Sequence, residues 1–341
     1  MPGEQNIPHI DIAALFIRNK EDVDEDALAS VVKKIGDACR DIGFLSITGT
    51  GLSTRLIADM GRIVRAVFDL NEQQKYANAI TPENYRGYIP LGFFSPNDGD
   101  VNGRDADQYE GYKLHFDVKA SDPVCQACHL YGPNIWPDHV PGARQIVQTY
   151  WAEMDRISAA ILNALADYLG LAHETLQAPF ETPLTNMTLL HYPPRHDSQA
   201  GFGIHPHKDT SALTIISPDA VGGLKVQTRD GNWIEAICPS GDLIVNIGDI
   251  LELWSGGRLV STPHLVESSP GQDRYSFPWF AVPRYDVIVA PLLERLPGFD
   301  RPPVHSGHWS AEIWRTNWLS ETANDDTPEL GTLAGPGITE S

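Results

Sequence analysis

Three side chains in one short stretch of the sequence have the chemistry of metal ligands. Residues 205–209 read HPHKD, so His205, His207 and Asp209 stand at alternate positions. Imidazole and carboxylate ligands without a thiolate suit Fe(II) better than a structural zinc site. On an extended strand, however, His205 and Asp209 lie about 13 Å apart. Because metal–ligand bonds are about 2 Å long, only two neighbours in the set, at a spacing of about 6.6 Å, are expected to share one ion.

The third ligand must come from another part of the chain, and His264 in LVSTPHLV is the candidate. A histidine on a facing strand, added to two ligands on the first strand, gives a 2-His-1-carboxylate triad. Such a triad occupies one face of an octahedral ion and leaves the opposite face open for oxygen and a substrate. The sequence therefore indicates oxygen chemistry at a non-haem iron.

A second pattern, Arg274-Tyr275-Ser276, follows ten residues after His264. On a strand, Arg274 and Ser276 point to the same face. A guanidinium beside a hydroxyl forms a fork for one carboxylate. The pattern is weak in isolation and gains weight from its place after the metal ligands.

The elements that must position these residues differ between the two halves of the chain. In the first half we expect strands at 7–12 and 44–48 and helices at 25–41, from an N-cap at Ser53 to about residue 68, and at 71–79. Residues 85–100 are rich in turn formers and are expected to be irregular. Apolar residues at intervals of three and four then predict one long helix over about 142–170, which must pack on something large.

From about residue 184 the pattern changes to short β-rich runs separated by Gly, Pro, Asp and Asn. The runs are MTLLHY, SALTII, LKVQT, WIEAI, DLIVNIG, LVSTPHLV and YSFPWFAV. Close spacing of this kind is typical of an all-β sandwich or barrel and not of a βαβ sheet. We expect a single domain over residues 1–341, because no repeat or low-complexity linker divides the chain.

The overall composition narrows the class of partner. The chain has 341 residues, of which 42% are hydrophobic, and 25 Lys plus Arg stand against 45 Asp plus Glu, for a formal net charge of −20. This charge repels phosphate backbones and anionic lipids, so nucleic acid and membranes are not expected as partners. No apolar run approaches the length of a membrane span and the start lacks the pattern of a secretory signal, which predicts a cytoplasmic protein. Nothing in the sequence specifies an oligomeric state.

The cysteines do not indicate a separate metal or redox site. Four cysteines are too few for a disulfide scaffold in a chain of this length. Cys125 and Cys128 form a CxxC motif, but a zinc site of this type needs a second such pair, which the sequence lacks. A purely local role is expected for both.

The ordered series of motifs resembles the Fe(II)/2-oxoglutarate-dependent oxygenases, in the branch similar to isopenicillin N synthase. The matching segments are IPHIDI, DIGFLSITGTGL, YRGYIPLG, GPNIWP, LLHYPP, HKDTSALTII, GGLKVQ, GNWIEA, NIGDILELWSGG, STPH and RYS. The resemblance implies a mainly β fold with flanking helices, in which a double-stranded β-helix (jelly-roll) core spans about 184–290. An N-terminal α/β extension over about 1–120, the supporting helix over about 142–170 and a C-terminal segment over 291–341 with a flexible tail complete this expectation.

Carried over by position, the resemblance implies that His207, Asp209 and His264 bind iron. Arg274 and Ser276 would hold the distal carboxylate of 2-oxoglutarate, and Tyr192 would assist in binding this co-substrate. His205 would be a bystander to the metal, near the substrate pocket. Phe280 would line the same pocket.

The implied activity is that of a dioxygenase that uses Fe(II), 2-oxoglutarate and O2. It would oxidise, most simply by hydroxylation, a C–H bond of a small organic substrate and release succinate and carbon dioxide. Two alternatives stay open among the oxygenases: an isopenicillin N synthase-like oxidase that does not use 2-oxoglutarate, and an ethylene-forming type of fragmentation of 2-oxoglutarate. A noncatalytic jelly-roll binding protein is the third alternative, which the complete set of ligands disfavours.

Overall fold

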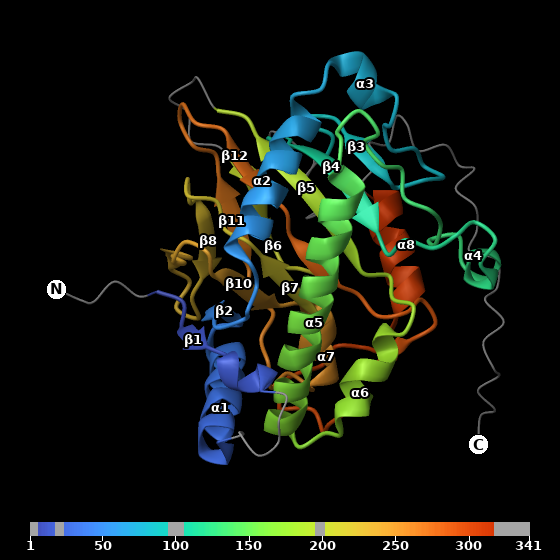
Figure 1. Ribbon diagram of the computed structural model, residues 1–341. Coiled ribbons are helices and arrows are strands. Elements are labelled where there is room, and N and C mark those ends of the chain that lie inside the picture. The colour runs from blue at the N-terminus through green and yellow to red at the C-terminus, as the bar shows by residue number, and fades with distance from the viewer. Residues whose placement is uncertain (1–5, 18–23, 95–105, 195–201, 317–341) are drawn as a thin grey trace.

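Two antiparallel sheets form the centre of the protein in the computed structural model, which describes residues 6–17, 24–94, 106–194 and 202–316 (Figure 1). The large sheet has the order β1-β2-β10-β7-β13-β5-β4-β3, and β12 also pairs with β5. Its strands are β1 (His9–Asp11), β2 (Phe44–Thr48), β3 (Gly87–Ile89), β4 (Glu110–His115), β5 (Asn186–Tyr192), β7 (Leu213–Ile216), β10 (Leu243–Ile247), β12 (Arg274–Ser276) and β13 (Trp279–Ala281). Apart from the parallel β1–β2 pair, neighbouring strands are antiparallel.

The small sheet has the order β6-β11-β8-β9. Its strands are β6 (Phe202–His207), β8 (Leu224–Gln227), β9 (Trp233–Glu235) and β11 (His264–Glu267). Apolar side chains of both sheets share one buried cluster, in which Phe44 and Ile244 of the large sheet meet Val226 and Val266 of the small sheet. The two sheets thus form a sandwich whose inner faces close around a common core. A separate two-stranded ribbon is made by β14 (Ile288–Val289) and β15 (Val304–His305).

Helices flank the sheets, and several of them contact strands of the large sheet. They are η1 (Ala13–Phe16), α1 (Glu25–Asp41), α2 (Thr54–Phe68), α3 (Glu72–Tyr76), α4 (Pro123–Ala127), α5 (Ala143–Leu169), α6 (His173–Gln177), η3 (Ala178–Phe180), α7 (Asp249–Trp254) and α8 (Ser306–Thr316). The long helix α5 crosses the front of the molecule in Figure 1 and contacts α1, α2, α6, β7 and β13. It begins after Gly142 and ends before Gly170, which both have positive φ (78° and 70°), a conformation that glycine adopts without strain. No helix in the described part of the chain is long and apolar enough to cross a membrane.

Two local expectations from the sequence are wrong. Residues 85–92, expected to be irregular, contain β3, which pairs with β4 at the edge of the large sheet. The HPHKD stretch is not one strand, because β6 ends at His207 and Asp209 lies beyond it. There the chain leaves the small sheet for β7 of the large sheet, and the Asp209 carbonyl accepts a hydrogen bond from the Asp249 N–H (2.7 Å). The flexible tail expected at the end of the segment 291–341 falls on residues 317–341, which lie outside the described residues.

Candidate functional site

Strand pairing brings together the three side chains predicted to bind a metal. His264 of β11 is the direct cross-strand partner of His207 of β6, and the two rings lie 4.3 Å apart. Asp209 places Oδ1 3.8 Å from Nε2 of His207 and 3.7 Å from Nε2 of His264. Within the described residues, this trio is the group of His, Cys, Asp and Glu side chains able to hold a metal ion.

Each of the two histidines uses one ring nitrogen in a hydrogen bond to the protein, which leaves the other nitrogen free to bind a metal. His207 donates its Nδ1–H to the carbonyl of His205 (2.8 Å), and His264 donates its Nδ1–H to the carbonyl of Thr262 (3.1 Å). Each Nε2 lone pair is therefore available, as in metal-binding histidines that use their other nitrogen as a donor. The rings are also oriented by packing, since Phe44 meets His264 edge-on at 5.3 Å.

The carboxylate is held in the same way by the large sheet. Oδ2 of Asp209 accepts hydrogen bonds from Thr214 Oγ1 on β7 (2.5 Å) and from Asn246 Nδ2 on β10 (2.7 Å). Oδ1 remains free and faces the two imidazoles. Two nitrogens and one oxygen without thiolate, closely spaced and open on one side, fit a non-haem Fe(II) ion.

The electrostatics of the trio favour the protonation states that bind a cation. Burial, helped by the nearby His264, lowers the pKa of His207 to about 4, so this imidazole is neutral at neutral pH. Burial by itself would raise the pKa of Asp209. The two histidines and the hydrogen bonds from Thr214 and Asn246 outweigh this effect and hold the Asp209 pKa below its usual value. A neutral imidazole and an ionised carboxylate are what a metal requires.

A buried guanidinium at the pairing of β12 with β5 has no acceptor for one of its nitrogens. Arg274 on β12 pairs with Tyr192 on β5, and its guanidinium carbon lies 4.7 Å from the Tyr192 ring. Its Nε donates to the carbonyl of Gly222 (2.7 Å), whereas the buried Nη1 has no hydrogen-bond partner among the described residues. Ser276, on the same face of β12, is also buried. An unpartnered buried guanidinium N–H calls for an acidic group, so these residues fit a carboxylate of 2-oxoglutarate.

His207 and Asp209 of the metal trio line a cavity of about 550 Å³. The two side chains predicted to lie near the substrate, His205 and Phe280, both line it. His205 is not grouped with the metal trio. Its Nδ1 instead lies 2.7 Å from Oδ1 of Asp107, which also accepts the His205 backbone N–H (3.0 Å). His205 is thus fixed in the wall of the cavity beside the triad.

Several cavity residues were not identified from the sequence. Lys113 and His115 enter from β4, Asp107 from the segment before it, and Trp309 and Trp314 from α8. The alternation of Lys113 and His115 about Leu114 could have shown that both point to one face of a strand. The α8 residues gave no comparable signal, since their approach to the cavity depends on long-range packing.

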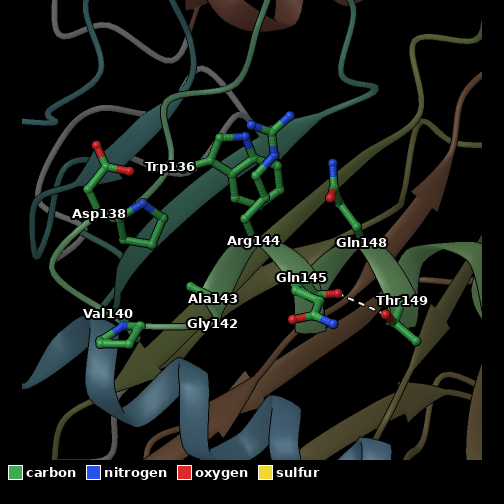
Figure 2. A pocket seen from close by; sticks show the side chains of 11 residues that line it. Trp136, Asp138, Val140, Gly142, Ala143, Arg144, Gln145, Gln148 and Thr149 are labelled. Atoms are coloured by element: carbon green, nitrogen blue, oxygen red, sulfur yellow. Dashed lines mark hydrogen bonds between the residues drawn. The ribbon is translucent and has the colours of Figure 1, made fainter.

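A second hollow, of about 580 Å³, lies on the outside of the protein at the start of α5 (Figure 2). Trp136 forms one wall, with the Arg144 guanidinium 5.5 Å from its ring. Arg144 is mostly exposed and lies 3.4 Å from Asp117. The residues lining this hollow bring no group of metal ligands together, so the chemistry is assigned to the cavity beside the trio.

Comparisons with known proteins agree with this geometry. Residues 7–139 match the family described as "non-haem dioxygenase in morphine synthesis N-terminal", and residues 184–283 match the "2OG-Fe(II) oxygenase superfamily". The chain is 31% identical to gibberellin 20 oxidase 1-B of Triticum aestivum over 290 residues, which covers 84% of this chain and 74% of the relative. It is also 31% identical to a homoarginine-6-hydroxylase of Arabidopsis thaliana over 291 residues, covering 84% and 80% of the two chains.

Among solved structures, a 2OG-Fe(II) oxygenase family protein from Caulobacter crescentus superposes with a TM-score of 0.76 at 25% identity, over 91% of this chain and 98% of the other. The sandwich of sheets is thus the jelly-roll fold of these enzymes. The chain belongs to the 2OG-Fe(II) oxygenase superfamily. It is a 2-oxoglutarate- and Fe(II)-dependent dioxygenase, an oxidoreductase whose cofactors and co-substrates are Fe(II), 2-oxoglutarate and O2. The family, the fold, the enzyme class and the cofactors predicted from the sequence are confirmed.

Proposed function

We propose that His207, Asp209 and His264 hold the iron of this dioxygenase. The observation that carries the proposal is the pattern of hydrogen bonds behind each ligand. Each of the three side chains has one polar atom occupied by the protein and one atom free, and the free atoms face one another. In a cluster that only stabilised the fold, buried polar atoms would be paired with hydrogen-bond partners, and three unpaired atoms would not point toward one another.

We further propose that Arg274, Ser276 and Tyr192 bind 2-oxoglutarate. Arg274 supplies a fixed positive charge, and its Nη1 still lacks an acceptor. Tyr192 is buried under the guanidinium, and burial raises its pKa to about 12, so its hydroxyl stays protonated and able to donate a hydrogen bond. The co-substrate carboxylate would satisfy these donors in a site closed to water.

We propose that the reaction is the hydroxylation of a small organic molecule. The bound iron, with 2-oxoglutarate and O2, supplies the oxidation of a C–H bond and yields succinate and carbon dioxide. The protein holds the substrate C–H bond toward the open side of the trio and excludes water, for which a cavity of about 550 Å³ is of suitable size. The homoarginine-6-hydroxylase to which the chain is similar is named for a reaction of this type.

The setting of the enzyme follows from other observations. We propose that the chain acts as one domain, because a single apolar core includes residues from Ile10 to Val289. All four cysteines are free, which supports a reducing compartment such as the cytoplasm. The strongly acidic composition supports a small-molecule partner and argues against nucleic acid.

Anaerobic titration with Fe(II) and 2-oxoglutarate tests the assignment of the trio. The wild type should bind one equivalent of iron, develop a visible charge-transfer band with 2-oxoglutarate, and release succinate when oxygen is admitted. Asp209→Ala should lose the band and bind iron at least tenfold more weakly, because it removes one ligand. His205→Gln is the matched control and should keep full iron affinity. Normal iron binding by Asp209→Ala, or its loss in His205→Gln, would contradict the proposed ligand set.

A further inference from the structure

One of the lysines in the cavity wall, Lys113, lies on the strand next to β5. Lys113 of β4 pairs with Thr188 of β5, and its side chain lines the cavity. Its Nζ donates hydrogen bonds to Asn186 Oδ1 (2.7 Å) and Thr188 Oγ1 (3.0 Å), the side chains of two alternate residues of β5. An ammonium has three N–H donors, so one donor remains for a group in the cavity.

No carboxylate in the described part of the chain forms an ion pair with this ammonium. Its two hydrogen-bond acceptors are neutral, and no carboxylate of the described residues lies within 4.0 Å of it. The carboxylates that share the cavity are already engaged: Asp107 with His205, and Asp209 with Thr214, Asn246 and the histidines. Burial lowers the pKa of Lys113 to about 7, and the charge of Asp209 acts in the opposite direction. Because burying a cation without an ion-pair partner costs free energy, we expect this cation to bind an acidic group of a ligand.

The surroundings of Lys113 are flat and aromatic. Its Nζ lies 5.4 Å from the centre of the Phe280 ring and 5.9 Å from that of Tyr85. The Trp314 ring packs on Tyr85 at 5.0 Å and on His115 at 5.3 Å, and all four side chains line the cavity. Such walls fit a planar apolar group placed next to the positive charge.

The position along β5 separates this cation from the proposed 2-oxoglutarate site. Arg274 pairs with Tyr192, whereas Lys113 pairs with Thr188, four residues earlier on the same strand. Four residues of extended chain span about 13 Å. The two cations are therefore spaced to serve two different acidic groups.

We propose that Lys113 determines substrate specificity by binding the carboxylate of a flat, apolar carboxylic acid whose ring system lies along Phe280 and Trp314. This inference rests on the proposed function of the adjoining metal site, because it places the substrate beside the trio. It adds the chemical class of the substrate, which the family alone does not give.

Matched acids and amides test the inference. Phenylacetate, 2-naphthylacetate and 4-biphenylacetate are compared with their carboxamides, which have nearly the same shape and no charge. Binding to the Fe(II)-loaded enzyme at saturating 2-oxoglutarate is measured anaerobically by calorimetry. In at least one pair the acid should bind tenfold or more tightly than the amide. Lys113→Met, close to lysine in length and apolar, should reduce this ratio to about one.

Lys33→Met is the control, because the Lys33 side chain on α1 is 73% exposed and does not line the cavity. It should keep the acid preference of the wild type. The inference is overturned if no acid is preferred in any pair, or if the preference survives in Lys113→Met. It is also overturned if Lys113→Met raises the 2-oxoglutarate concentration for half-maximal charge-transfer absorbance tenfold, since Lys113 would then serve the co-substrate. Failure of the metal-site proposal is distinguishable, because the wild type would then show no charge-transfer band and no succinate release at all.

Discussion

The buried ammonium of Lys113 should make the stability of the enzyme depend on pH above neutrality. Its pKa is about 7 in the folded protein, compared with the usual 10.5 for lysine, because burial disfavours the charged form. Lys113→Met removes this titration and keeps an apolar chain of similar length against Phe280. The change also removes the hydrogen bonds to Asn186 and Thr188. Because the donor is the titrating group itself, any pH dependence of these bonds belongs to the same titration.

The sign and size of the effect follow from proton binding. Between pH 7 and 10.5 the unfolded chain keeps the lysine proton that the folded protein has released, so the free energy of unfolding of the wild type increases with pH. The slope approaches about 1.4 kcal/mol per pH unit in this window, and the complete shift corresponds to roughly 4 to 5 kcal/mol as an upper bound. Below pH 7 the full destabilisation by the buried charge is present. Lys113→Met has no such slope.

Urea unfolding of both proteins at pH 6, 7, 8 and 9, with a chelator present to exclude metal binding, gives the comparison. The free energy of unfolding of Lys113→Met minus that of the wild type should be constant from pH 6 to below 7 and then decrease by about 1 kcal/mol or more per pH unit. Lys33→Met is the control, since the Lys33 side chain is 73% exposed. Its difference from the wild type should not vary over the same range. A difference for Lys113→Met that stays flat up to pH 9 would refute the reasoning.

Two further changes probe the neighbouring groups. Arg274→Met should raise the 2-oxoglutarate concentration for half-saturation roughly 30-fold or more, because loss of a buried charge-assisted pair costs about 2 kcal/mol or more. Iron affinity, measured without 2-oxoglutarate, should be unchanged. If the variant binds 2-oxoglutarate as tightly as the wild type does, Arg274 is not part of the co-substrate site. Asn246→Leu deletes one of the two donors to Asp209 Oδ2 and should weaken iron binding about 10- to 100-fold. Asn163→Leu on α5, far along the chain from the trio, is its control, and equal iron affinities in the two variants would show that Asn246 does not position the carboxylate.

The sequence was informative where a local pattern has one structural meaning. The strand at Phe44–Thr48 and the helix at Glu25–Asp41 occur at the residues expected from their apolar periodicity. The glycines at 142 and 170 delimit the long helix, whose apolar stripe required a large packing partner. The position of His264 opposite His207 was also foreseeable, because a third ligand had to return through sheet pairing. In each case the spacing in the sequence limits the geometry directly.

Other features depend on contacts between distant segments and could not be read locally. Asp209 lies beyond the end of β6, since its carboxylate is drawn to Thr214 and Asn246 of the other sheet. Its backbone is fixed there by Asp249. Nothing in HPHKD shows that the chain leaves the strand at this point. Likewise α8 reaches the cavity because of how the C-terminal part packs, and its two tryptophans have no spacing signal that points to a site.

The strand arrangement separates Lys113, the proposed substrate-binding residue, from the metal trio. Tyr192 is the partner of Arg274, Thr188 is the partner of Lys113, and the metal trio belongs to other strands and to the crossing between the sheets. A change at Lys113 should therefore alter the charge that a substrate meets without moving the proposed iron ligands or the residues proposed to bind 2-oxoglutarate. Burial of this ammonium costs stability, and the hydrogen-bond acceptors that the protein supplies to it are neutral. A lysine at this position is best accounted for by an acidic substrate that accepts its remaining hydrogen bond.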